Sequence, residues 1–219
     1  MKLTSLSEQL FLLAMDRRGS VAGNRYRMQI SLVMAGLLDL EEAGIIKLAQ
    51  QAVIVKATSL PGDLLFLQPL HELITKMKKP TLKKIADKYC GTFTDRELKK
   101  YLTSIRNELL QKQLVQVTQK AGYLGKQSIY SADEAELALL LDDVIKQITD
   151  EAPNGKMLAL WVLLEKTKLS GKYFTKDTLN QVRKKLADLT DQPLFNDLKI
   201  MEKEIEATFL VLLTAATVN

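Results

Sequence analysis

Apolar residues recur at helical spacing over most of the chain. Leucines at positions 6, 10 and 13 follow the capping box Ser5-Leu-Ser-Glu8, and a similar stretch from about Met28 to Ala43 is followed by the stop signal Gly44. Each pattern predicts a helix. The same criteria place further helices from the turn at 61–63 to about 79, from 81 to 89, from 94 to about 113, from 131 to 149, from 155 to the break at 171, from about 176 to 189 and from about 194 to 218.

Two short stretches interrupt the helical pattern. Residues 45–48 and 52–57 predict one β-hairpin, and residues 114–118 and 127–130 predict a second, across a loop at 120–125. The last helix is apolar on all sides from Ala207 onward, so we expect it to be buried. The expected fold is mainly α: a single helical domain over residues 1–219 around a buried C-terminal helix, with two short β-hairpins.

The chemistry that most enzymes need is scarce in this sequence. With one histidine, His71, and one cysteine, Cys90, the chain has no zinc-ligand cluster and no disulfide framework. Neither a nucleophile elbow nor a glycine-rich phosphate loop is present. We therefore expect a protein that is not an enzyme and uses neither a metal nor another cofactor.

Positive charge is concentrated in the middle of the chain. Residues 76–126 contain 13 Lys/Arg and four Asp/Glu, a balance of +9, whereas the remainder has 18 basic and 22 acidic residues, a balance of −4. Such a segment indicates a polyanionic partner, although lysines on solvated helix faces would give the same composition. The longest apolar run, residues 207–218, is too short to span a bilayer. We expect a cytoplasmic protein that meets membranes from the side.

Three short segments are candidate binding sites. A segment with two arginines around an aromatic precedes the second helix, and guanidinium groups near a helix start suit a phosphate, although they could equally pair with local acids. A basic helix follows Thr94, and after that helix comes a loop whose apolar tip is flanked by lysines. The headgroup candidates are Asn24, Arg25, Tyr26, Arg27, Lys99, Thr103 and Arg106, and the membrane-contacting candidates are Lys120, Tyr123, Leu124 and Lys126.

The same region permits a second interpretation. A capped basic helix followed by a strand, a basic loop and a strand is the order of a winged helix, with 96–112 as recognition helix and 120–126 as wing. Arg106, Asn107 and Gln111 could contact base edges. Because positive charge does not distinguish DNA phosphate from lipid phosphate, a nucleic-acid-binding function over 94–130 stays open.

Several segments in order resemble the Golgi phosphoprotein 3 family. The opening residues 3–16 are similar to the start of the family's sequences, and the helix end at 36–44 resembles a second signature. The segment 61–65 looks like the family's Thr-Gly-Asp-x-Leu-Leu, and residues 105–110 with Leu114 and Val115 resemble its arginine-bearing helix before a hairpin. The similarity extends over nearly the whole chain, which resembles a prokaryotic form because it has no long polar N-terminal extension.

The resemblance implies a helical domain that binds phosphatidylinositol 4-phosphate on the cytosolic membrane face, assisted by a hydrophobic hairpin. It also implies an adaptor that holds a protein cargo. In register with the family, the headgroup positions fall on Asn24, Val33, Thr103 and Arg106, and only Arg106 retains the family residue. The expected partner is therefore an anionic phospholipid surface, with Arg25, Tyr26 and Arg27 as possible substitutes for the changed groups.

Overall fold

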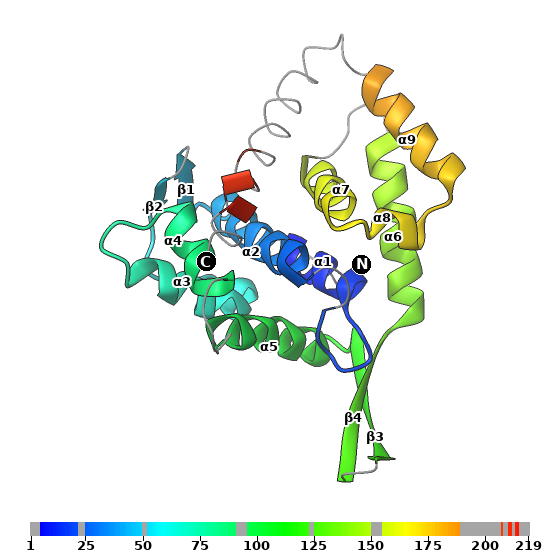
Figure 1. Ribbon diagram of the computed structural model, residues 1–219, viewed down its shortest axis with the longest axis horizontal. Helices are drawn as coiled ribbons and strands as arrows, with labels where there is room; N and C mark the ends of the chain where they lie inside the picture. The colour runs from blue at the N-terminus through cyan, green and yellow to red at the C-terminus, as the bar shows by residue number, and fades with distance from the viewer. Residues whose placement is uncertain are drawn as a thin grey trace.

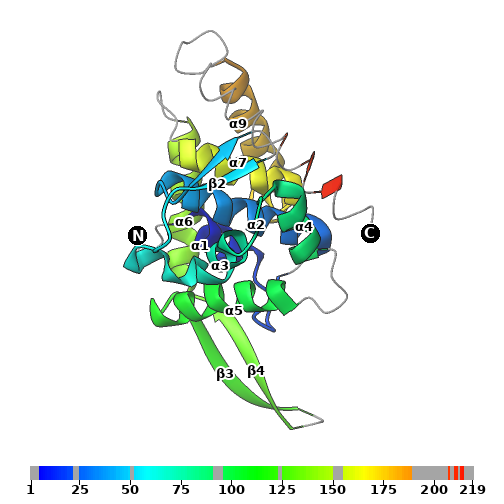
Figure 2. The same cartoon turned by 90° about the vertical axis from the view of Figure 1, so that its left-hand side faces the viewer.

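The computed structural model describes residues 5–21, 25–49, 52–90, 96–122, 125–149 and 155–188, together with 207, 210, 211, 213 and 214. The fold is mainly α with two hairpins, as the sequence predicted (Figures 1 and 2). The elements are α1 (Leu6–Ala14), α2 (Arg25–Glu42), β1 (Ile46–Ala49), β2 (Ala52–Val55), the 3-10 helix η1 (Gly62–Leu67), α3 (Gln68–Thr75), α4 (Leu82–Cys90), α5 (Arg96–Gln111), β3 (Val115–Gly122), β4 (Gly125–Ala132), α6 (Glu134–Thr149), α7 (Gly155–Thr167), α8 (Ser170–Tyr173) and α9 (Lys176–Asp188).

Helix α1 lies at the centre of the molecule, and every one of its residues is buried. It packs against α2, α5 and α7. The sequence predicted one stripe of leucines, but the polar side chains of Ser7, Glu8 and Gln9 are buried as well. Because a buried polar group is costly unless it is hydrogen-bonded, the position of α1 depends on the partners that these groups find.

The N-terminus of α1 is closed by a carboxylate from α2. Asp39 accepts hydrogen bonds from the backbone N–H of Leu6 (2.7 Å) and of Ser7 (2.9 Å), and also from the Ser7 hydroxyl. Burial raises the pKa of the Asp39 carboxyl, and the hydrogen bonds from Ser7 and Leu6 offset part of that rise. The predicted capping box of Ser5 and Glu8 is confirmed beside it. These contacts satisfy amide groups that a buried helix start would otherwise leave without partners.

A partly buried ion pair joins α1 to Lys112, the residue after α5. The Lys112 ammonium lies 2.6 Å from a carboxylate oxygen of Glu8, whose side chain is 0% exposed, and 3.2 Å from Glu108. Burial alone lowers the pKa of Lys112, but the hydrogen bond and charge of Glu8, together with those of Glu108, outweigh burial and raise it. The positive charge of Lys112 therefore keeps the Glu8 carboxylate paired inside the protein.

Three helices end with one hydrogen-bond pattern. At the end of α2, Ile45 N–H donates to Leu40 and Gly44 N–H to Glu41, with Gly44 at φ +70°, so the predicted stop at Gly44 is confirmed. Gln113 and Lys168 hold the same left-handed conformation after α5 and α7, at φ 59° and 62°. The prediction that Gly171 ends α7 was wrong, because Lys168 makes the stop and Gly171 lies within α8.

Two further boundary predictions need correction. Ser131 does not cap α6: it lies in β4, and Asp133 is the cap, accepting from the Glu136 backbone N–H at 3.0 Å. The helix predicted up to 79 ends at Thr75. The helix predicted from 81 to 89 is confirmed as α4, and the Thr81 hydroxyl caps its start by accepting from the Lys84 N–H. Thr94 lies outside the described residues.

The C-terminal segment does not fill the centre of the fold. In the part of 207–214 that the structure describes, Leu210 is 60% exposed, and Ala207 and Thr214 are exposed too. Val211 and Leu213 are half-buried and pack on the edge of the core. The prediction of a tail helix that is buried on all sides was therefore wrong for these residues. The central position belongs to α1, where apolar side chains are accompanied by the hydrogen-bonded polar groups of Ser7 and Glu8.

We predict that Asp39→Ala lowers the free energy of unfolding by about 2–4 kcal/mol, because it leaves two buried N–H groups at the start of α1 without acceptors. Urea unfolding of the purified protein measures this. Asp142→Ala on the exposed side of α6 is the matched control and should change stability by about 0.5 kcal/mol or less. Equal effects of the two substitutions would contradict the role given to Asp39.

Candidate functional site

The hairpin β3–β4 projects from the body of the protein beyond the end of α5 (Figures 1 and 2). Its strands pair from Val115↔Ala132 to Gly122↔Gly125, so both are longer than the sequence predicted. Because Lys120 and Ala121 point to opposite faces, and Lys126 pairs with Ala121, the two lysines of the hairpin lie on opposite faces near its tip. Tyr123 and Leu124 lie outside the described residues.

At the base of this hairpin, Arg106 of α5 contacts two other elements. Its Nη1 donates to the carbonyl of Gly19 at 3.2 Å, and its guanidinium lies over the ring of Tyr130 in β4, 4.9 Å from the centroid. The Tyr130 backbone N–H donates to the Arg17 carbonyl at 2.9 Å. We call this arrangement of Gly19, Arg106 and Tyr130 the hairpin clasp. It brings the loop after α1, helix α5 and strand β4 together.

The loop within the clasp carries two more guanidinium groups. Asp16 shapes this loop by accepting from the backbone N–H groups of Arg18 and Ser20. Arg17 and Arg18 are exposed, and no ion pair or hydrogen bond is made by either side chain among the described residues. Sequence reasoning missed both, because it treated them only as a helix end. Because Arg106 reaches the carbonyl of Gly19 in the same loop, we group Arg17, Arg18 and Arg106 under the name arginine cluster.

The predicted site before α2 is only partly described. Asn24 lies outside the described residues, and for Arg25 and Tyr26 only the backbone, in the first turn of α2, is described. Arg27 donates from Nη1 to the Lys166 carbonyl at the end of α7, at a distance of 3.4 Å. Val33, which takes a headgroup position in the family register, is 1% exposed and belongs to the core. Hence the described part of this segment does not bring Arg27 to Arg106.

Helix α5 places three predicted residues along one side. Lys99 and Thr103 are exposed and Arg106 is half-buried, at the spacing of successive helical turns. However, not every cation of the basic segment 76–126 is unpaired. Lys76 pairs with Glu72 and Lys100 pairs with Glu97, so part of its charge is neutralised within the protein. Only some of the 13 cations of the segment are therefore available to an external anion.

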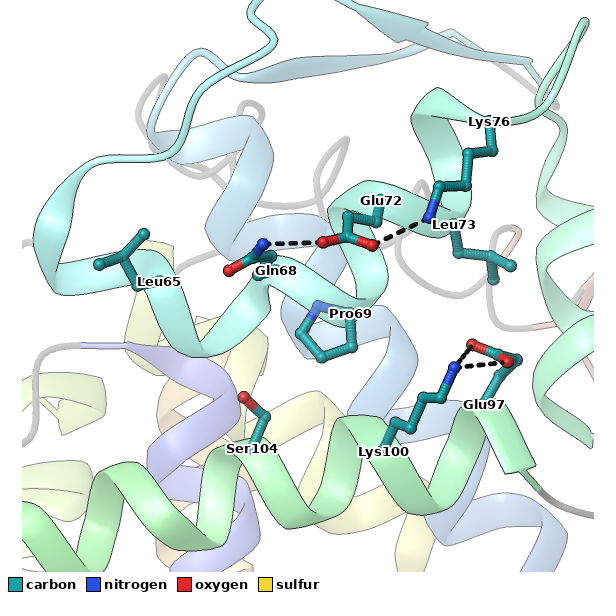
Figure 3. A pocket seen from close by; sticks show the side chains of 9 residues that line it. All are labelled: Leu65, Gln68, Pro69, Glu72, Leu73, Lys76, Glu97, Lys100 and Ser104. Atoms are coloured by element: carbon teal, nitrogen blue, oxygen red, sulfur yellow. Dashed lines mark hydrogen bonds and ion pairs between the residues drawn. The ribbon is translucent and has the colours of Figure 1, made fainter.

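A groove of about 370 Å³ lies between α3 and α5 (Figure 3). Its charged groups satisfy one another: Glu72 accepts from Gln68 and Lys76, and Lys100 donates to Glu97. The hydrogen bond from Lys76, with that from Gln68, holds the pKa of Glu72 below its usual value. Among its described lining residues the groove offers no unpaired cation, so it is a poorer site for a phosphate than the arginine cluster.

Two negative findings apply to the described part of the chain. No helix there is both long and apolar enough to cross a membrane. No group of three or more His, Cys, Asp and Glu side chains there is placed to hold a metal ion. The single histidine, His71, is buried, and its Nε2 lies 3.0 Å from the Ala57 carbonyl, which is a structural contact.

We predict that Gly19→Ala lowers the free energy of unfolding by about 2 kcal/mol or more, whereas Gly44→Ala costs about 1 kcal/mol. Both glycines have left-handed φ values, +66° and +70°. A Cβ at Gly19 would lie 2.6 Å from the Tyr130 ring and 2.9 Å from Arg106, but at Gly44 it meets nothing within 4 Å. Urea unfolding of both variants separates the cost of crowding the hairpin clasp from the cost of a left-handed φ. Equal losses of stability would show that Gly19 is not in close contact with Tyr130 and Arg106.

Comparison with known proteins gives one result that covers most of the chain. The family model described as Golgi phosphoprotein 3 (GPP34) matches residues 6–206. This range includes α1, the loop with Arg17 and Arg18, α5, both hairpins and α9. No curated protein matches the chain.

Proposed function

The chain belongs to the Golgi phosphoprotein 3 family, and we propose that it is a peripheral membrane protein that binds anionic phospholipid headgroups. The favoured headgroup is a phosphate monoester of the phosphatidylinositol 4-phosphate type. The proposed site is the arginine cluster at the base of the projecting hairpin. The proposed role is that of an adaptor without catalytic activity, which works in the cytoplasm and carries a protein cargo to the membrane.

The observation that carries this proposal is the contact between the loop that holds Arg17 and Arg18 and Arg106 of α5, which is far away in the sequence. Arg17 and Arg18 come from the loop after α1, and Arg106 comes from α5 and reaches the carbonyl of Gly19 in that loop. A guanidinium group can donate two parallel hydrogen bonds to a phosphate, and such charge-assisted bonds are stronger than neutral ones. Three guanidinium groups on adjoining segments would suit a phosphate group that carries more than one negative charge.

The hairpin supplies the second half of the proposed docking mode. Its described part carries Lys120 and Lys126 on opposite faces, with no acidic residue from Val115 to Ala132. The sequence places Tyr123 and Leu124 between these lysines. An apolar tip that enters the headgroup region, with lysines beside it that contact lipid phosphates, is a favourable arrangement for a segment that lies on a bilayer surface.

A winged-helix type of nucleic-acid binding is the second candidate, and one observation favours it. Helix α5 buries Leu98, Tyr101, Ile105 and Leu109 and exposes a polar stripe on its other side. That stripe contains Arg96, Lys99, Lys100, Thr103, Asn107 and Gln111, and the hairpin follows it as a wing would. The lipid proposal is preferred because the arginine cluster lies at the hairpin base, away from the N-terminal half of this stripe.

We predict that the triple substitution Arg17→Gln, Arg18→Gln and Arg106→Gln weakens binding to anionic vesicles by roughly 100-fold, because each cation near such a surface contributes about 1 kcal/mol. Co-sedimentation with phosphatidylcholine vesicles containing phosphatidylinositol 4-phosphate measures the affinity. Wild-type binding should also fall steeply as salt is raised. Vesicles containing phosphatidylglycerol, and inorganic phosphate in solution, separate a specific headgroup from general anionic attraction.

The control for this experiment removes the same charge elsewhere. Helix α9 carries Lys176, Lys184 and Lys185 and lies at the opposite end of the molecule from the hairpin (Figure 1). The triple Lys→Gln variant of α9 should bind vesicles within about twofold of the wild type. Equal losses in the two variants would contradict the site, and preference for duplex DNA over acidic vesicles in one buffer would favour the nucleic-acid alternative.

We predict that Tyr123→Asp with Leu124→Asp weakens vesicle binding by about tenfold or more, because it puts two negative charges where an apolar tip should enter the headgroup region. Thermal unfolding should change little, since the substitutions lie at the end of a projecting hairpin. Gln119→Asp with Ser128→Asp, at a pair further down the same hairpin, adds the same charge and should have a smaller effect. A larger effect at this second pair would place the membrane contact on the hairpin stem.

A further inference from the structure

Tyr130 is the residue through which the hairpin touches the arginine cluster. Its ring lies under the guanidinium of Arg106, and its backbone N–H donates to the carbonyl of Arg17. A Cβ at Gly19 would meet the ring at 2.6 Å, so ring and loop are in close contact. One residue of β4 therefore contacts both segments that supply the arginines.

Among the described residues, two contacts hold the guanidinium of Arg106. Nη1 donates to the Gly19 carbonyl, while Nε is buried without a hydrogen-bond partner among the described residues. The Tyr130 ring face is then the remaining contact that sets the plane of the group, through the attraction between a cation and an aromatic face. A guanidinium held in one plane loses less freedom when it binds an oxyanion than a mobile one does.

We infer that Tyr130 is a positioning residue for Arg106: the face of its ring orients the guanidinium toward a bound phosphate group and ties the hairpin to that site. The inference rests on the proposed function and adds to it a residue that sequence reasoning did not select. Within the described residues the Tyr130 hydroxyl makes no hydrogen bond, so the ring face rather than the hydroxyl carries the role.

A double-mutant cycle between Tyr130 and Arg106 tests this. With vesicles containing phosphatidylinositol 4-phosphate, Tyr130→Leu should weaken binding about five- to tenfold, whereas Tyr130→Phe should stay within about twofold of the wild type. In an Arg106→Gln background, Tyr130→Leu should then have no further effect, because Tyr130 acts through Arg106. Full additivity of the two losses, or an equal loss in Tyr130→Phe, would overturn the inference.

A spectroscopic measurement without lipid keeps the inference separate from the proposed function. The Nε–Hε signal of Arg106 in a nitrogen-15 spectrum should be displaced by the Tyr130 ring, retained in Tyr130→Phe and moved in Tyr130→Leu. Ile129→Ala, whose side chain lies on the other face of the hairpin, should leave the signal unchanged. If the wild type binds no anionic vesicle, the proposed function fails while this signal still decides whether Tyr130 positions Arg106; an unmoved signal in Tyr130→Leu overturns the inference.

Discussion

The burial of α1, with its first N–H groups and the Glu8 carboxylate paired to distant side chains, is the constraint on which the rest of the structure depends. A helix buried on all sides exposes its first N–H groups to the protein interior, where water cannot reach them. Asp39 from α2 accepts from two of these groups, and Glu8 of α1 pairs with Lys112 after α5. These two contacts fix α1 against both neighbours at once, so α2 and α5 are set relative to each other by the helix between them.

The same helix positions the proposed binding site from its other end. When α1 ends, the chain enters the turn that Asp16 shapes, and Gly19 of this turn accepts a hydrogen bond from Arg106. The rigid helix α1 sets the distance from its buried start to this turn. Helix α5 likewise sets the position of Arg106. Arg106 thus lies on a regular element, which holds a functional group more closely in place than a mobile loop does, and the loop with Arg17 and Arg18 follows the rigid helix α1.

The local pattern of the chain predicted the helices, the two hairpins and the capping box at Ser5, because each depends on neighbouring residues. It did not predict which helix would be central. The tail segment is more uniformly apolar than α1, but α1 can be buried because a carboxylate and an ammonium from distant segments pair with Ser7 and Glu8. The candidate site shows the same limit: Arg106 was found from the basic helix and from the family resemblance, whereas Arg17, Gly19 and Tyr130 join it only through tertiary contacts.

The most direct test of the central claim is a map of where the protein touches a membrane. Hydrogen–deuterium exchange compares the wild type on vesicles containing phosphatidylinositol 4-phosphate with the wild type beside phosphatidylcholine vesicles. The account predicts added protection in residues 16–20, around Arg106 of α5 and in the hairpin strands, with α9 unchanged. Protection confined to α9, or absent from the loop that carries Arg17 and Arg18, would contradict it.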